Sequence, residues 1–305
     1  MAKKRGNINS MSKMKKREWA AGYLFLLPNF IGFLIFTGIP VVMGFYVSMT
    51  DYTGFGEMTF VGLENYIKMF HDSDFLVALK NTIIYAITSV PLTILFSLLL
   101  ALMLNRKLYG GKAFQTIYFF PNLTSMVAVG CVFLQLFQTE DGPVNQFLMN
   151  IGIENPPKWF WGASTALMTV VIVVVWKQAG YYMVMFLGGL KNIPQHLYEA
   201  AKIDGANAWQ CFWNVTWPML SPTTFMVTIL TFIASFQVYD IINVTTEGGP
   251  GRATEVLVMR IYKEAFKYGK MGYGTAIGYF LFLIIFIITL IQWKGQKNWV
   301  VDDNI

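Results

Sequence analysis

Charged residues are scarce in this chain of 305 residues. Only 13% of its side chains are charged, whereas 55% are hydrophobic. Soluble globular domains carry about 25% charged residues, so the composition excludes an ordinary soluble domain. Together with several long apolar runs, it predicts an all-α polytopic membrane protein.

Cysteine and histidine are also rare, with two residues of each. Cys131 lies in an apolar run and Cys211 in a polar-flanked stretch, so we expect neither a disulfide between them nor a metal site. His71 and His196 are far apart in the chain, and both fall in predicted loops. An intramembrane enzyme is therefore left without a recognisable set of catalytic residues.

A phosphate-binding loop is missing as well. Such a loop needs Gly, four residues and then Gly-Lys-Ser/Thr, because its backbone N–H groups cradle the phosphates. The nearest stretch, Gly110-Gly111-Lys112-Ala113, lacks the hydroxyl residue, and Arg106 stands where the first glycine is needed. We therefore expect no ATP, metal or other cofactor on this chain.

Long apolar runs, in contrast, are plentiful. Six of them have the roughly 20 residues that cross a hydrocarbon core of about 30 Å. The first is too long for a signal peptide, and we expect it to be tilted or broken near Pro28 and Pro40. A basic segment, 1–19, precedes the transmembrane domain, 20–293, and a short tail, 294–305, follows it. The predicted spans are 20–49, 75–104, 114–137, 165–190, 223–244 and 273–293.

Lysine and arginine set the expected orientation. If the N-terminus lies in the cytoplasm, the cytoplasmic segments hold 14 basic residues and the outer segments 8. Cytoplasmic loops of membrane proteins are enriched in Lys and Arg, so we expect both termini in the cytoplasm. The basic N-terminal run adjoins a span and has no interleaved aromatic residues. It is typical of an anchor to membrane lipid and not of a nucleic-acid-binding segment.

Polar side chains inside two predicted spans are candidates for a substrate pathway, because polar groups are costly inside a membrane. Such residues suit a hydroxyl-rich solute: aromatic faces stack on sugar rings, and amide, hydroxyl and carboxylate groups bind hydroxyls. Alternatively, they hold neighbouring helices together. The candidates are Lys177, Gln178 and Tyr181 in the fourth span and Thr231, Ser235 and Asp240 in the fifth. Lys177 and Asp240 are also a possible ion pair.

A polar, interrupted stretch, 194–217, separates the fourth and fifth spans. We expect a short helix over 194–203, a break at Asp204-Gly205 and a second helix over 206–217, whose aromatic residues suit a membrane interface. Ala200 and Ala201 give the first helix a nearly bare face with charges beside it. The residues alone fit either an ordinary connector or a docking element for another protein.

This stretch resembles a known motif. Glu199-Ala200-Ala201-x-x-Asp204-Gly205-Ala206, followed by Phe212 and Pro218, is similar to the EAA motif of the membrane subunits of binding-protein-dependent ABC importers. Segments 60–66, 189–194 and 246–250 resemble the carbohydrate-uptake permeases, of the type that includes the first permease of the maltose and glycerol-3-phosphate systems. The likeness covers nearly the whole chain from about residue 19.

The resemblance implies a type I ABC importer permease fold with six transmembrane helices in a bacterial or archaeal cytoplasmic membrane. It implies that the chain is not an enzyme and works with a second, non-identical permease. Two ATPase subunits, which bind ATP and Mg, and an extracellular or periplasmic sugar-binding protein complete the importer. In that family the EAA helices seat in clefts of the ATPase subunits. By resemblance, the coupling residues are Glu199, Ala200, Ala201, Asp204, Gly205, Ala206 and Phe212.

Gap-free spacing from the same motifs assigns the family's sugar pathway to Lys177, Gln178, Tyr181, Thr231 and Ser235. We add Asp240 because it falls near the outer end of the fifth predicted span. Lys177 leaves an acidic sugar open as the substrate, and glycerol-3-phosphate or a related polyol phosphate is a further alternative. A non-transporting membrane scaffold is the rival from a different class.

Overall fold

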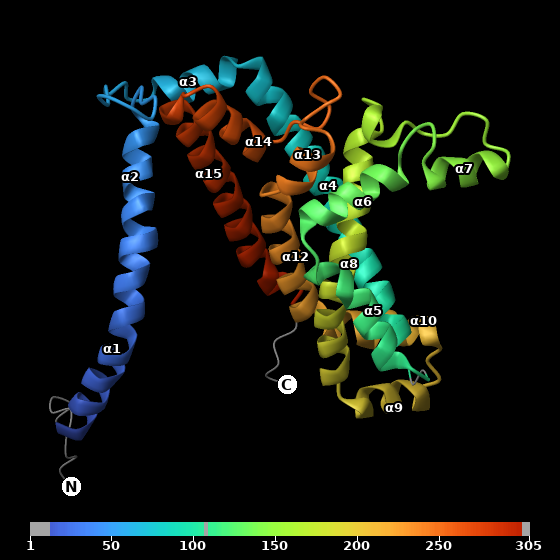
Figure 1. The fold of residues 1–305 in the computed structure, drawn as a ribbon. Coiled ribbons are helices and arrows are strands. Elements are labelled where there is room, and N and C mark those ends of the chain that lie inside the picture. Colours follow the sequence, from blue (N-terminus) through green and yellow to red (C-terminus); the bar gives the residue numbers. More distant parts are fainter. Residues whose placement is uncertain (1–12, 107–108, 301–305) are drawn as a thin grey trace, which may run out of the picture.

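A computed structural model describes residues 13–106 and 109–300, and over these ranges the chain forms helices and no strand (Figure 1). The N-terminal part of the basic segment and the end of the predicted tail lie outside the described residues. The helices are α1 (Lys13–Phe33), α2 (Ile39–Ser48), α3 (Glu64–His71), α4 (Ser73–Leu104), α5 (Gly111–Leu123), α6 (Met126–Leu136), α7 (Pro143–Asn150), α8 (Ala166–Asn192), α9 (Gln195–Ile203), α10 (Ala208–Cys211), α11 (Trp217–Met219), α12 (Ser221–Phe236), α13 (Asp240–Thr245), α14 (Leu257–Tyr262) and α15 (Met271–Gly295). Short π-helical turns are η1 (Leu34–Gly38), η3 (Phe212–Thr216) and η4 (Lys263–Lys267), and 3₁₀ turns are η2 (Trp159–Trp161) and η5 (Gln296–Asn298).

The apolar helices account for all six predicted spans. Four helical segments in the described part of the chain are long and apolar enough to cross a membrane, and two bent pairs raise the number to six. The expectation of an all-α membrane protein with six spans is therefore confirmed. The continuous segments are Arg17–Ser48, Ser73–Leu104, Ala166–Asn192 and Met271–Gly295, and the bent pairs are α5 with α6 and 208–219 with α12.

The third span is not the single helix that its apolar run predicts. α5 and α6 meet at an angle of 99°. Pro121 lies in the last turn of α5, and the backbone of Thr124 and Ser125 is extended. This extended backbone ends the helical hydrogen-bond ladder, so the chain turns sharply here.

The fifth span, predicted over 223–244, is also interrupted. α12 ends at Phe236, and α13 begins only at Asp240. On its other side α12 is bent by 65° from the helix that precedes it. The first span, in contrast, continues past Pro28, which lies inside α1, and Pro40, which lies in the first turn of α2. A π-helical turn between these prolines takes the place of the expected break.

α8 forms the centre of the bundle. It packs along α4 and α5, and much of its surface is buried. Gly180 permits the contact with α5, because a Cβ atom at this position would lie 1.8 Å from the carbonyl oxygen of Tyr118. The backbones of two spans thus touch at one glycine, close to the bend that ends α5.

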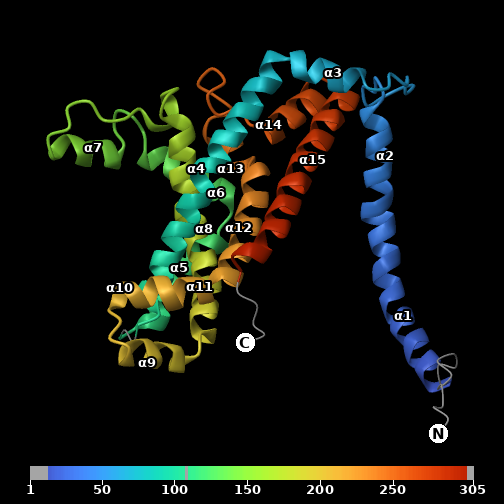
Figure 2. The same ribbon diagram turned by 180° about the vertical axis from the view of Figure 1, so that it is seen from behind.

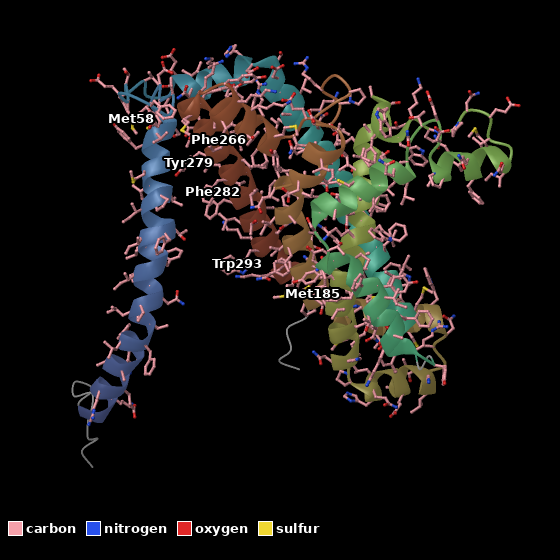
Figure 3. The ribbon with its side chains drawn as sticks, in the orientation of Figure 1. Met58, Met185, Phe266, Tyr279, Phe282 and Trp293 are labelled. Atoms are coloured by element: carbon pink, nitrogen blue, oxygen red, sulfur yellow. The ribbon has the colours of Figure 1, made fainter. Side chains whose placement is uncertain are left out.

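The first span stands apart from this bundle (Figures 1 and 2). Its upper part, α2, contacts α15, and a groove of about 560 Å³ runs between them. Figure 3 shows Tyr279 and Phe282 on the side of α15 that faces α2. Lower down, Phe25 and Leu26 of α1 are exposed. Apolar surface of this kind is stable in contact with lipid tails or with another apolar helix.

Candidate functional site

A polar cavity of about 150 Å³ lies where the interrupted spans meet α4 and α8. Its wall combines hydroxyl, amide, phenol and carboxylate side chains with a smaller number of apolar ones. The polar lining residues are Tyr85, Ser89 and Thr93 from α4, Gln178 from α8, Thr231 and Ser235 from α12, and Gln237, Tyr239 and Asp240 from the break before α13 and its start. Met126, the first residue of α6, also faces this cavity.

The cavity brings together four of the six residues expected to line a substrate pathway, namely Gln178, Thr231, Ser235 and Asp240. The hydroxyl of Thr231 donates to the Val227 carbonyl at 2.7 Å, and that of Ser235 donates to the Phe232 carbonyl at 2.7 Å. Both hydroxyl oxygens therefore keep lone pairs with which to accept hydrogen bonds from a ligand.

Tyr181 and Lys177 do not line the cavity. Tyr181 is 40% exposed on α8, with its ring 5.0 Å from that of Tyr182. The Lys177 side chain is buried and donates from Nζ to the carbonyl oxygen of Asn122 at 3.1 Å. Lys177 and Asp240, whose pairing the sequence left open, do not pair: no ion pair among the described residues includes either of them.

Sequence reasoning missed the contribution of α4. Tyr85, Ser89 and Thr93 are all buried, and they follow one another at intervals of four residues. Residues with this spacing lie on one face of a helix. A polar stripe inside an apolar span was therefore visible in the sequence, although its partners across the cavity were not.

The stretch between the fourth and fifth spans forms the predicted pair of helices at the end of the molecule farthest from α3 (Figures 1 and 2). α9 ends at Ile203, and Gly205 turns the chain with a φ of +77°. Asn207 then starts the second helix with a capping box: its side chain accepts from the Gln210 N–H at 2.9 Å, and its own N–H donates to the Gln210 side chain at 2.8 Å. This helix continues through η3 to Met219, beyond its predicted end at residue 217.

The residues expected to contact another subunit are mostly at the surface of these helices. Glu199 is exposed and accepts a hydrogen bond from Gln195 at 3.0 Å. Phe212 is half-buried and packs against Trp209, Trp213 and Trp217. Its position favours a role in anchoring the second helix. Ala200, Asp204 and Gly205 are also exposed, whereas Ala201 and Ala206 are half-buried.

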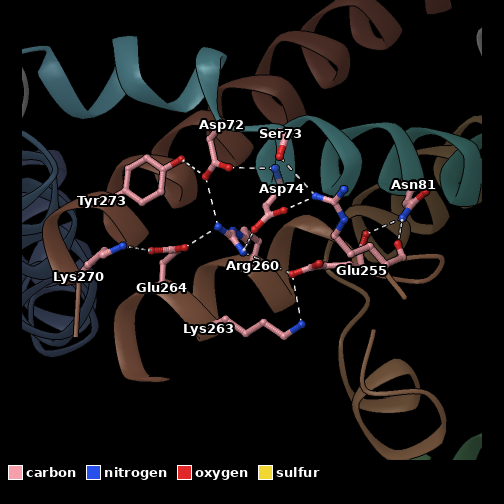
Figure 4. A network of polar contacts seen from close by, with 11 residues as sticks. Asp72, Ser73, Asp74, Asn81, Glu255, Arg260, Lys263, Glu264, Lys270 and Tyr273 are labelled. Atoms are coloured by element: carbon pink, nitrogen blue, oxygen red, sulfur yellow. Dashed lines mark hydrogen bonds and ion pairs between the residues drawn. The ribbon is translucent and has the colours of Figure 1, made fainter. Parts of the chain in front are cut away.

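At the opposite end, Arg260 of α14 is the centre of an ion-pair network that joins α14, η4 and the start of α4 (Figure 4). Its guanidinium lies 2.6 Å from Glu264, 3.0 Å from Asp74, 3.3 Å from Asp72 and 3.8 Å from Glu255. Sequence reasoning had counted Arg260 only as one basic residue of a loop. In the structure it is buried and links segments almost 190 positions apart, as the 188-residue separation from Asp72 shows.

Asp72 makes this network sensitive to pH. Burial by itself raises the pKa of the Asp72 carboxyl, but hydrogen bonds from the Tyr273 hydroxyl and the Asp74 N–H, together with the charge of Arg260, lower it overall. A carboxyl whose pKa is lower in the folded protein stabilises the fold above its unfolded-state pKa. That stabilisation is lost as the pH falls towards the folded-state pKa.

We therefore expect the free energy of unfolding to fall as the pH drops below about 4, and part of this fall to disappear in Asp72→Asn. Denaturant unfolding of the purified protein across this pH range measures the effect. Asp51→Asn, at an exposed carboxyl, serves as the control and should keep the wild-type slope. An unchanged slope in Asp72→Asn would contradict the assignment.

Comparison with known proteins adds three findings. The sequence profile of the family described as "Binding-protein-dependent transport system inner membrane component" matches residues 81–293. The chain is 36% identical over 280 residues to the probable ABC transporter permease protein YurN of Bacillus subtilis (strain 168), covering 90% of this chain and 96% of that protein. It is 35% identical over 278 residues to the arabinooligosaccharides transport system permease protein AraP of the same strain, covering 90% and 88%.

The fold has a solved counterpart as well. A chain in the crystal structure of a bacterial alginate ABC transporter, in complex with an alginate pentasaccharide-bound periplasmic protein, matches with a TM-score of 0.80 and 26% identity. The match covers 92% of this chain and 94% of that chain. The residues that the family profile matches include those that line the polar cavity and those of the helix pair after α8.

Proposed function

Because the chain belongs to the family of binding-protein-dependent transport system inner membrane components, we propose that it is an importer permease whose polar cavity carries a sugar or oligosaccharide. The observation that carries the proposal is the cavity itself, with its hydroxyl and amide groups between interrupted spans. The names of relatives agree, since AraP is named for arabinooligosaccharides and the matched transporter for alginate. A scaffold without transport needs no such cavity.

Each lining residue has a role in this proposal. Thr231 and Ser235 accept hydrogen bonds from sugar hydroxyls, Gln178 both donates and accepts, and Asp240 accepts at the mouth of the cavity. Tyr181 lies outside the cavity and extends the pathway towards a second, non-identical permease.

The helix pair 194–217 is the coupling element in the same proposal. Its exposed residues, Glu199, Ala200, Asp204 and Gly205, form the surface that docks on ATPase subunits, while Phe212 anchors the second helix to the membrane domain. ATP and Mg bind to those subunits and not to this chain. The end of the molecule that carries α9 then lies in the cytoplasm, together with both termini. The opposite end, which carries α3, faces a sugar-loaded binding protein. ATP-driven movement of α9 shifts the spans between two states.

Filling the cavity tests the pathway. We expect Ser235→Leu to reduce uptake at least about tenfold, because a larger apolar side chain occupies the space of the sugar and removes a hydrogen-bond acceptor. The measurement is uptake of labelled arabino- and malto-oligosaccharides by cells in which the chromosomal gene is replaced by the variant. Met226→Leu, at an exposed position of the same helix, is the matched control. Uptake at the wild-type rate in Ser235→Leu would rule out the cavity as the pathway.

A further inference from the structure

The break between α5 and α6 leaves the half-buried end of a helix beside α8. The last carbonyl groups of a helix have no N–H partners within it, and such groups are costly in apolar surroundings. Two of them have side-chain donors here. The Pro121 carbonyl accepts from the Thr124 hydroxyl at 2.6 Å as well as from the Thr124 N–H at 3.3 Å. The Asn122 carbonyl accepts from the Lys177 ammonium at 3.1 Å.

Lys177 comes from a different span, and its charge suits this position. The C-terminal end of a helix carries a partial negative charge, which a nearby cation stabilises. Lys177 is only 7% exposed, and it has no carboxylate partner among the described residues. One turn further along α8, Gly180 brings the backbone against the Tyr118 carbonyl of α5. Two neighbouring contacts therefore fix the end of α5 on α8.

The position of α6 depends on that fixed end. α5 packs on α8, whereas α6 packs mainly on α13 and contacts α8 through Phe133 and Trp176, so the break joins two segments with different main neighbours. Met126, at the start of α6, lines the cavity. A shift in the end of α5 would therefore move one wall of the cavity.

We propose, building on the proposed function, that Lys177 is a positioning residue for transport. Its ammonium group holds the end of α5 and thereby sets the α6 wall of the cavity, without touching the substrate. This assignment also defines the substrate class. The described residues that line the cavity include one carboxylate, Asp240, and neither Lys nor Arg. The part of the site formed by this chain thus takes an uncharged sugar unit, because an anionic one would meet Asp240 without a neighbouring cation.

The transport test compares Lys177→Arg and Lys177→Met with Lys80→Met, which alters an exposed lysine of α4. For labelled neutral oligosaccharides, we expect Lys177→Met to lower the maximal uptake rate at least about tenfold and to leave KM within about twofold, since no substrate contact is lost. Lys177→Arg retains most of the rate, because it retains the cation, and Lys80→Met equals wild type. A raised KM with an unchanged maximal rate in Lys177→Met would overturn the proposal. A second result would overturn it as well: uronic-acid oligosaccharides that inhibit neutral-sugar uptake by the wild type but do not inhibit uptake by Lys177→Met.

A second readout does not depend on the substrate. Spin labels at Ile117 of α5 and Val132 of α6, both exposed, report the geometry of the break in the complex purified from its host, with Cys131→Ser and Cys211→Ser as background. We expect one narrow distance distribution in wild type and Lys177→Arg, and a shifted or broadened one in Lys177→Met. An unchanged distribution in Lys177→Met would overturn the positioning role. If the distances respond as expected but wild type takes up no sugar, the proposed function fails and the positioning role stands.

Discussion

Replacing Gly205 with proline should strongly reduce the coupling of transport to ATP hydrolysis and leave the chain folded in the membrane. Gly205 joins α9 to the second helix with a φ of +77°, and its N–H donates to the Lys202 carbonyl at 3.1 Å. Proline fixes φ near −65° and has no N–H, so it fits neither the turn nor its hydrogen bond. Because the residue is exposed and no side chain lies within 4 Å of a Cβ placed there, the damage is confined to the turn.

The expected loss of coupled activity in Gly205→Pro follows from the backbone conformation. A residue forced from its preferred region costs about 1–3 kcal/mol, so the two helices settle at a different angle and no longer move together. We expect solute-stimulated ATP hydrolysis and uptake to fall at least about tenfold, since a misplacement of about 1 Å has effects of this order or larger at sites that depend on geometry.

A matched control exists on the same chain. Gly152 also has a positive φ, of +96°, and its N–H donates to the Met149 carbonyl at 3.0 Å. It lies beyond α7, at a distance from the coupling element. Gly152→Pro therefore imposes the same local change elsewhere and should leave stimulated hydrolysis intact. Equal loss in both variants, or normal coupling in Gly205→Pro, would count against the role assigned to 194–217.

Replacing Arg260 with glutamine should destabilise the fold by about 3–5 kcal/mol, because removing one partner of a buried ion pair leaves uncompensated charge behind. The Arg260 side chain is 8% exposed and that of Glu264 is 3% exposed, at a separation of 2.6 Å. Without Arg260, the cation left beside Glu264 is Lys270, whose Nζ lies 3.9 Å away. The segments joined by the network, the α3–α4 junction and α14, would then separate more easily.

Arg252 provides the comparison. It pairs with Asp74 in the same network, but its side chain is 46% exposed, and exposed pairs contribute about 0–1 kcal/mol. Unfolding of the purified protein in denaturant should therefore separate Arg260→Gln, with a large loss, from Arg252→Gln, with a small one. If the two variants lost the same stability, the buried network would not be what holds this end of the molecule together.

The sequence was sufficient for the number of spans and for the helix pair after α8. Apolar runs of membrane-spanning length predicted the spans, and Pro194, Asp204 and Gly205 predicted the helix pair. The breaks in the third and fifth spans were not predicted, because apolar residues continue on both sides of each one. Polar residues do stand at the breaks: Asn122, Thr124 and Ser125 in the third span and Gln237, Tyr239 and Asp240 in the fifth. Pro121 was a signal, but many transmembrane helices tolerate proline, so it did not decide the matter.

The partners of individual residues were harder to predict. Lys177 was singled out correctly as costly inside a span, yet its partner is a backbone carbonyl 55 residues away, which no side-chain pattern reveals. Arg260 pairs with four carboxylates, two of which, Asp72 and Asp74, lie more than 180 positions away in the sequence. Tyr85, Ser89 and Thr93 did carry a readable spacing, and a search for polar stripes in every span would have found them.

The central claim is that this chain conducts a sugar under the control of ATPase subunits docked on 194–217. The most direct test isolates the chain with an affinity tag from its own host, reconstitutes the co-purified complex in liposomes and measures ATP hydrolysis with and without sugar-loaded binding protein. We predict that ATPase subunits co-purify, that hydrolysis rises when the loaded binding protein is added, and that labelled sugar accumulates in the liposomes. Hydrolysis at the same rate with and without loaded binding protein, or a complex without any ATPase, would contradict the claim.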